Sequence, residues 1–115
     1  MHGACDTARE ALALYRRFPE MRDSGVFAAY KIAGVLLRAE GVSADAVEAV
    51  ELAERLTRET GVRALEPEAL RVRAELERLR GDEAARQRAL REAHRILLEI
   101  GATSRAAHVA AEMSR

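Results

Sequence analysis

The chain has 115 residues, the size of one small domain, and its 19 basic and 19 acidic residues give a formal net charge of zero. A neutral chain has no overall field that would attract nucleic acid or an anionic membrane, so we expect neither as a partner. Hydrophobic residues make up 49% of the chain but aromatic residues only 3%, so the core must be built mainly from Ala, Leu, Val and Ile.

Apolar side chains recur at helical spacing between Gly and Pro residues, which predicts an all-α chain of six helices. The first helix is expected to begin at Thr7, where Thr7 and Glu10 form a capping box, and to stop before Pro19. The second follows Ser24 as its N-cap residue and runs towards Gly41.

The third helix is predicted to open at the N-cap residue Ser43 and to end at Gly61, where a left-handed residue is needed. The fourth begins with Pro67 at its first position and ends near Gly81.

Asp82 is the expected N-cap residue of the fifth helix, which stops at Gly101. Ser104 is expected to cap a short sixth helix that carries Val109 and Met113.

The second and third helices recur in the fourth and fifth at one fixed separation along the chain. Gly41 and Gly81 are 40 residues apart, and so are Gly61 and Gly101. We call this separation the repeat offset. Chance matching of Ala-rich helices is the alternative explanation. The single domain, residues 1–115, should therefore consist of four segments: a leading helix (1–23), a first helix pair (24–61), a second helix pair (62–101) and a terminal capping helix (102–115).

The spacing within each pair resembles a tetratricopeptide repeat, and the first copy carries it on Tyr30, Gly34, Gly41, Ala46 and Ala53. We expect Gly34 and Ala53 to let the two helices of the pair approach backbone to backbone. The resemblance implies a right-handed α-solenoid of antiparallel helix pairs, in which the first helix of each pair lines a concave groove.

The second copy departs from this pattern with charged residues at Arg73, Glu77 and Arg86. Its stretch from Pro67 to Leu76 resembles the C-terminal helical repeats of large bacterial signalling ATPases, including transcriptional activators and cyclase-linked regulators. The resemblance implies a repeat region that relays the presence of a partner or ligand to a nucleotide-binding module. No GxxxxGK[ST] phosphate loop occurs in the chain, so ATPase activity is not expected here.

The resemblance also implies six partner-binding positions in the groove, namely Lys31, Val35, Arg38, Arg71, Glu75 and Arg78. Two rows of cations, Lys31 with Arg71 and Arg38 with Arg78, are expected to grip a carboxylate or an acidic peptide segment. The ordinary alternative is a solvated helix face, because Arg is the commonest charged residue of this chain.

Residue types able to support catalysis are few and scattered. His94 and His108 fall on different predicted helices, and His2 with Cys5 and Asp6 offers at most three metal ligands without a recognised spacing. Ser24, Ser43 and Ser104 are explained by their predicted N-cap positions, so the sequence gives no independent support for a serine nucleophile. We therefore expect no enzyme activity, no metal and no cofactor.

Cys5 is the only cysteine, which excludes an internal disulfide and favours a reducing compartment. No run of about 18 apolar residues could span a bilayer. These features predict a cytoplasmic protein.

The expected function is protein–protein interaction, with a peptide or partner domain bound in the groove. One alternative is a homo-oligomerisation unit that packs through exposed end layers. These layers would carry Val109 and Met113 at one end and Leu12, Leu14, Tyr15 and Phe18 at the other. A small-ligand sensor is a further alternative.

Overall fold

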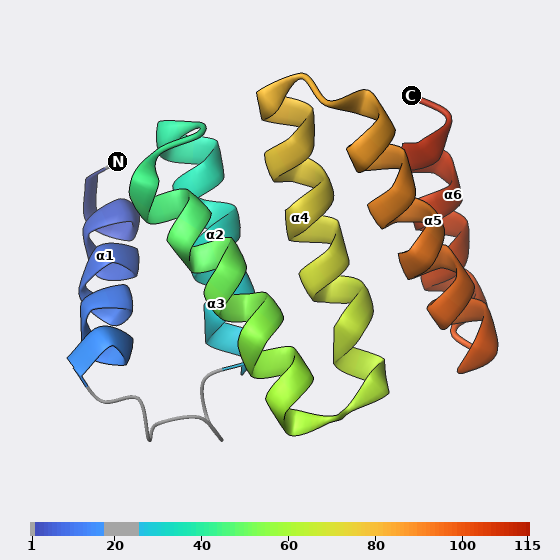
Figure 1. Cartoon of the computed structure of the whole chain (residues 1–115), viewed down its shortest axis with the longest axis horizontal. Coiled ribbons are helices and arrows are strands. Elements are labelled where there is room, and N and C mark those ends of the chain that lie inside the picture. Colours follow the sequence, from blue (N-terminus) through green and yellow to red (C-terminus); the bar gives the residue numbers. More distant parts are fainter. Residues whose placement is uncertain (1, 18–25) are drawn as a thin grey trace.

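The computed structural model describes residues 2–17 and 26–115, and every regular element in these residues is a helix (Figure 1). The expected all-α chain with six α-helices is thereby confirmed for the described residues. The α-helices are α1 (His2–Arg17), α2 (Val26–Glu40), α3 (Ala44–Thr60), α4 (Glu66–Arg80), α5 (Glu83–Glu99) and α6 (Thr103–Met113). A short 3₁₀ turn, η1 (Arg63–Leu65), precedes α4.

Two of the predicted N-caps are present. The Ser43 hydroxyl accepts a hydrogen bond from the Ala46 N–H at 3.0 Å, and the Asp82 carboxylate accepts one from the Ala85 N–H at 3.0 Å. Each satisfies one of the N–H groups that the first turn of a helix leaves without a partner. Gly61 ends α3 in the predicted left-handed conformation, with φ of 66°.

Three other predicted boundaries are wrong. The first helix begins at His2 rather than Thr7, because the stretch before Thr7 contains no Pro and its one Gly, Gly3, is tolerated inside the helix. Ser104 lies inside α6, since Gly101 ends α5 and leaves the N-cap position to Ala102. Pro67 is the second residue of α4, not the first. The predictions for Pro19 and Ser24 lie outside the described residues.

The helix bounds follow the repeat offset seen in the sequence. Helices α2 and α4 each have 15 residues, and α3 and α5 each have 17. Val26 and Glu66 begin α2 and α4, and Glu40 and Arg80 end them, so both pairs of boundaries are separated by the repeat offset.

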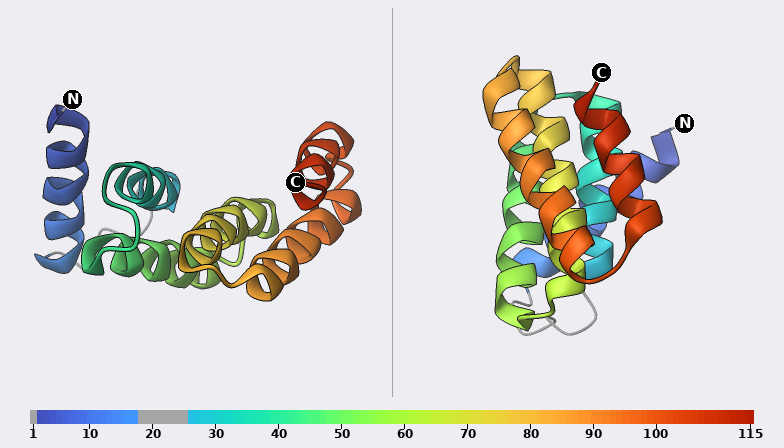
Figure 2. Two further views of the ribbon diagram at one scale, coloured as in Figure 1. Left: turned by 90° about the horizontal axis from the view of Figure 1, so that it is seen from above. Right: turned by 90° about the vertical axis from the view of Figure 1, so that its right-hand side faces the viewer.

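Consecutive helices pack side by side, and the row that they form is curved. Seen from above, α2 and α6 rise on the same side of the molecule with α4 between them, while α3 and α5 lie on the other side (Figure 2).

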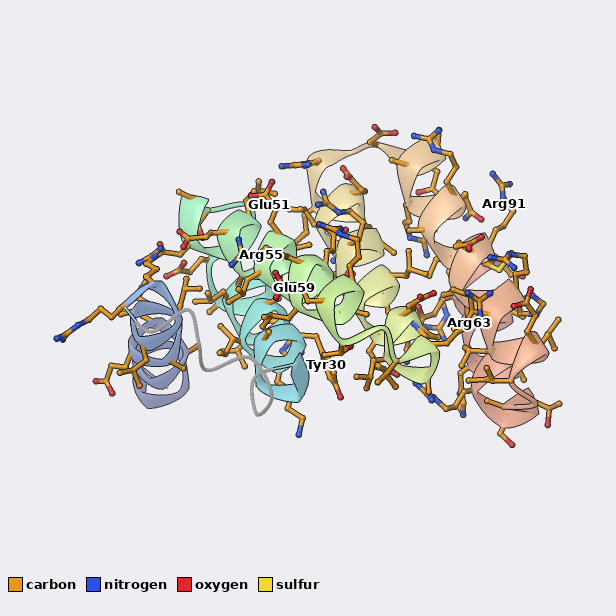
Figure 3. All side chains as sticks on the ribbon, turned by 60° about the horizontal axis from the view of Figure 1, so that its bottom comes forward. Tyr30, Glu51, Arg55, Glu59, Arg63 and Arg91 are labelled. Atoms are coloured by element: carbon orange, nitrogen blue, oxygen red, sulfur yellow. The ribbon has the colours of Figure 1, made fainter. Side chains whose placement is uncertain are left out.

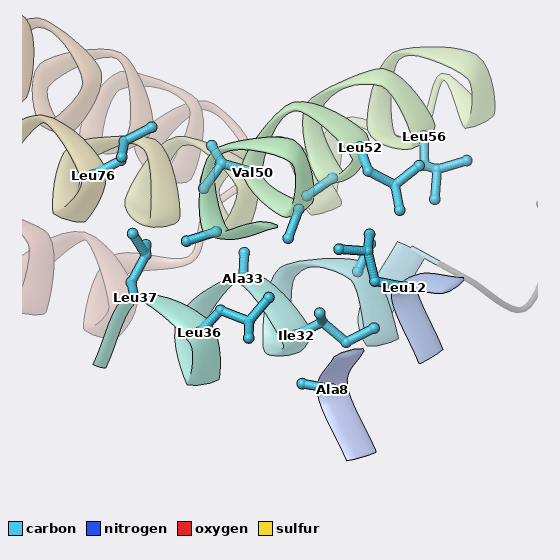
Figure 4. Packing of buried hydrophobic residues seen from close by; sticks show 14 residues of the cluster. Ala8, Leu12, Ile32, Ala33, Leu36, Leu37, Val50, Leu52, Leu56 and Leu76 are labelled. Atoms are coloured by element: carbon cyan, nitrogen blue, oxygen red, sulfur yellow. The ribbon is translucent and has the colours of Figure 1, made fainter. Parts of the chain in front are cut away.

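The buried apolar residues form two clusters that meet at α4. The first cluster joins α1, α2 and α3 and includes Leu76 of α4, which is fully buried (Figure 4). The second cluster joins α4, α5 and α6 and includes Ala74. Because α4 contributes to both clusters, the two halves of the chain are packed as one unit.

The apolar side of α6 is turned inward, as expected for a terminal capping helix. Val109 and Ala106 are buried against α5, and Met113 packs partly against the same cluster. At the other end, Leu12 is buried in the first cluster, whereas Leu14 is half exposed. Val109 is therefore not available on the surface for self-association.

Candidate partner-binding groove

A groove of about 580 Å³ is lined by residues of α2, α4, α5 and α6. Helix α4 contributes the most residues to its lining, and the other three helices flank it. Apolar contacts within the groove come from Leu37, Val72 and Leu90. A hollow of this volume lies within the range of about 300–1,000 Å³ typical of binding clefts.

Charged side chains of both signs dominate the rest of the lining. The basic residues are Arg38, Arg71, Arg78, Arg86 and Arg115. The acidic residues are Glu68, Glu75, Glu83 and Glu112. Each of these four glutamates forms an ion pair with an arginine, whereas Arg38 and Arg115 form none within the described residues. The pKa of the Glu75 carboxyl is lowered chiefly by its hydrogen bond from Arg78 and also by the charge of Arg38, so Arg38 interacts with this carboxylate without forming an ion pair.

Four of the six predicted partner-binding residues line this groove, namely Arg38, Arg71, Glu75 and Arg78. The other two do not. Lys31 is exposed on α2 outside the lining, and Val35 packs against the first apolar cluster.

The expected rows of free cations are not present as predicted. Arg71 pairs with Glu112 of α6, and Arg78 donates to both carboxylate oxygens of Glu75, at 3.0 and 2.6 Å. Hydrogen bonding from Arg78 lowers the pKa of the Glu75 carboxyl, so this carboxylate stays charged near neutral pH and keeps Arg78 engaged. Both arginines are therefore already engaged in ion pairs within the chain.

Arg38 differs from Arg78 because of one substitution between the two copies. The residue three positions before Arg78 is Glu75, which binds it, whereas the residue three positions before Arg38 is Val35. Arg38 consequently has no carboxylate on its own helix at that spacing, and its guanidinium is exposed at the groove.

The expected role of Gly34 in close helix packing is wrong. A Cβ atom added at Gly34 would lie 3.5 Å from Nη1 of Arg38. Leaving aside the chain neighbours and the backbone of α2, it would have no other heavy atom within 4 Å. Gly34 lines the groove instead of facing α3. The contact between α2 and α3 is made by Ala33 and Ala53, which are almost completely buried.

Arg86 is among the groove residues that were not predicted to bind a partner. It is only 8% exposed, and it donates hydrogen bonds to the Glu83 carboxylate at 2.8 Å and to the Glu112 carbonyl at 2.7 Å. The one sequence feature that could have pointed to Arg86 is that it is charged where the repeat pattern is usually apolar or small. The partner, Glu112, could not be inferred because it lies 26 residues away on another helix.

The described residues contain no group of three or more His, Cys, Asp or Glu side chains placed to hold a metal ion. His94 is partly exposed on α5 and His108 is exposed on α6. The side chains of His2 and Cys5 lie outside the part of the structure that is described. Among the described helices, none is long and apolar enough to cross a membrane.

The opposite surfaces carry ordinary solvated charges. Glu51, Arg55 and Glu59 follow one another along the exposed side of α3 at the spacing of one helical turn, and Arg91 projects from α5 (Figure 3). Arg91 does not line the groove.

No protein-family model, no curated protein and no solved structure matches the chain. Its function therefore has to be inferred from the groove itself.

Proposed function

We propose that the chain is a tetratricopeptide-like, right-handed α-solenoid that works as a noncatalytic protein interaction module. Its groove would bind a peptide or a partner domain. The two helix pairs of equal length and the curved row of helices support this architecture. By the sequence resemblance, the module would belong to a larger bacterial cytoplasmic regulator.

The observation that carries the proposal is the combination of shape and charge in the groove. Val72, which is only partly buried, offers apolar surface to a peptide, and the charged residues around it can fix the register of that peptide. Arg38 adds a guanidinium with no ion-pair partner in the described residues. An exposed guanidinium pairs most strongly with a carboxylate, so the preferred partner would be acidic.

A peptide library displayed on phage, selected against the full chain, tests this function. We expect enriched peptides to contain Asp or Glu beside apolar residues. Arg38→Glu should weaken the best peptide at least about tenfold in Kd, equivalent to about 1.4 kcal/mol. Arg91→Glu is the matched control, because it makes the same charge change on α5 outside the groove.

Arg38 is a better test residue than Arg71 or Arg78, whose loss would also release Glu112 or Glu75. Fluorescence polarisation should be accompanied by circular dichroism for both variants. Selection of no peptide, or equal loss of binding in both variants, would reject the groove as the partner site.

A further inference from the structure

The last turn of α6 is held by three side chains of α4 and α5. Arg71 of α4 pairs with the carboxylate of Glu112. From α5, Arg86 donates to the Glu112 carbonyl at 2.7 Å, and the Gln87 side-chain amide donates to the Met113 carbonyl at 3.0 Å. We call Arg71, Arg86 and Gln87 the α6 seat.

The α6 seat recognises one glutamate and two successive main-chain carbonyls. Carbonyls in the last turn of a helix lack the usual partner four residues on, so donors from outside can bind them. The Glu112 carbonyl also accepts a longer hydrogen bond from the Arg115 N–H at 3.3 Å. Arg86 is nearly buried and is fixed by Glu83, which makes its guanidinium a preoriented donor. Such a set of groups can bind any segment that presents a carboxylate beside two free carbonyls.

The corresponding positions of the first helix pair are apolar. At the repeat offset, Arg86 and Gln87 correspond to Ala46 and Val47, and Glu112 corresponds to Val72. All three apolar residues belong to, or pack against, the first apolar cluster, where they help to join the two helix pairs. The fold therefore uses apolar packing where α4 meets the first pair and polar contacts where the last turn of α6 docks.

Polar contacts in the α6 seat should lower the free energy needed to undock α6, compared with apolar contacts at the same positions. Its side chains can be hydrated after release, whereas exposed apolar groups remain unfavourable in water. The Arg71–Glu112 and Glu68–Arg105 pairs that connect α6 to α4 are partly exposed, so each contributes little to stability. Only Ala106 and Val109 of α6 are buried.

We propose that α6 is an internal, displaceable ligand of the groove, and that an acidic peptide partner binds by replacing Glu112 in the α6 seat. This proposal rests on the groove function proposed above and adds its regulation. In the unbound chain, α6 occupies Arg71 and Arg86, and tethering gives it a high effective concentration there.

A synthetic, fluorescently labelled peptide of residues 102–115 tests the α6 seat directly. It should bind weakly to the unmodified full chain, because the chain's own α6 competes. Val109→Asp places a charge on the buried side of α6 and should expose the seat, so the peptide should bind this variant at least about tenfold more tightly.

Two matched controls accompany this measurement. Ala107→Asp adds the same charge to the exposed side of α6 and should leave binding as weak as in the unmodified chain. A peptide carrying Glu112→Gln should bind the Val109→Asp chain about tenfold less tightly than the unmodified peptide. Absence of binding to a folded Val109→Asp chain, or equal affinity of the two peptides, overturns the proposal.

Hydrogen exchange of the unmodified chain provides a second test if Val109→Asp does not fold. Backbone amides of α6 should exchange at least about tenfold faster than those of α5, because α6 opens separately. Equal protection of both helices contradicts a displaceable α6. If the phage library yields no binding peptide but the 102–115 peptide binds, the proposed partner function is rejected, while the proposal that α6 is an internal ligand of the groove stands.

Discussion

Arginine side chains that break the apolar pattern of the second helix pair find partners on other helices. Arg73 donates to both carboxylate oxygens of Glu54 on α3, at 2.9 and 2.6 Å, and also pairs with Glu77. Arg86 joins α5 to α6 by donating to the main-chain carbonyl of Glu112. The third charged departure, Glu77, pairs with Arg73 and Arg80 of its own helix, so the two arginines are the departures that link one helix to another.

Gly34 offers a test at the scale of one residue. It lies inside α2 with a helical backbone, and a new methyl group would meet only the flexible end of Arg38. Gly34→Ala should therefore stabilise the chain by about 0.5–1 kcal/mol, because Ala loses less backbone entropy on helix formation. Thermal unfolding followed by circular dichroism measures the change.

Gly41→Ala serves as the opposite control, since Gly41 has a φ of 67° that strains any residue with a Cβ. It should lower the melting temperature. A loss of stability in Gly34→Ala as well would mean that the glycine is required for packing after all.

Helix α4 is the element that connects the two apolar clusters. Leu76 is fully buried in the first cluster, while Ala74 belongs to the second, so one helix takes part in both. The bidentate contact from Arg73 to Glu54 reinforces the same junction. We expect the halves of the chain to unfold together for this reason.

Truncating Leu76 tests that coupling. Leu76→Ala should cost about 2–5 kcal/mol, since it removes buried methyl groups and leaves a cavity. Urea unfolding monitored by circular dichroism should show a lower midpoint. Leu79→Ala, on the exposed side of the same helix, is the control and should change stability by less than about 0.5 kcal/mol. Equal midpoints for the two variants would contradict a coupling role of α4.

The whole molecule is slightly more open than a sphere-like domain of its length. Its radius of gyration is 14.0 Å, against about 13 Å expected for a compact domain of this length. The groove lined by α2, α4, α5 and α6 is consistent with this more open shape. The terminal helices are held by buried apolar residues, with exposed ion pairs added on the surface.

Acid should destabilise the chain through these ion pairs. Hydrogen bonds from arginine or glutamine side chains lower the pKa of Glu48, Glu75, Glu83, Glu92 and Glu99 from the ordinary value of 4.5. A carboxyl whose pKa is lower in the folded state contributes stability above its unfolded pKa and loses it as pH falls through the folded value. The melting temperature should therefore be nearly constant above about pH 5 and fall below about pH 4.5.

Calorimetry across this range measures the effect, and salt provides its control. At about 1 M NaCl the Debye length is near 3 Å, so the acid-induced decrease should become smaller. A melting temperature that does not change between about pH 6 and pH 3 would show that the ion pairs contribute nothing to stability.

Much of the helical architecture could be predicted because it depends on short stretches of sequence. The caps at Ser43 and Asp82 and the left-handed Gly61 follow from local backbone chemistry. Four of the six predicted partner-binding residues line the groove, and three of them lie on α4. Of the pairs matched by the repeat offset, Arg38 and Arg78 both line it, whereas Lys31 and Val35 lie outside the lining and their counterparts Arg71 and Glu75 lie within it. Val35 packs against the first apolar cluster instead.

Local sequence signals are enough to predict six helices and the length of the repeated pair, since propensity, spacing and capping act between neighbouring residues. Which charged side chains form ion pairs depends instead on how the helices pack. Helix packing brings Glu112 to Arg71 and Arg86, which lie 41 and 26 residues before it in the chain. It also leaves Arg38 without an ion pair in the described residues and turns Gly34 towards the groove. These outcomes depend on how whole helices pack, which no local pattern of residues specifies.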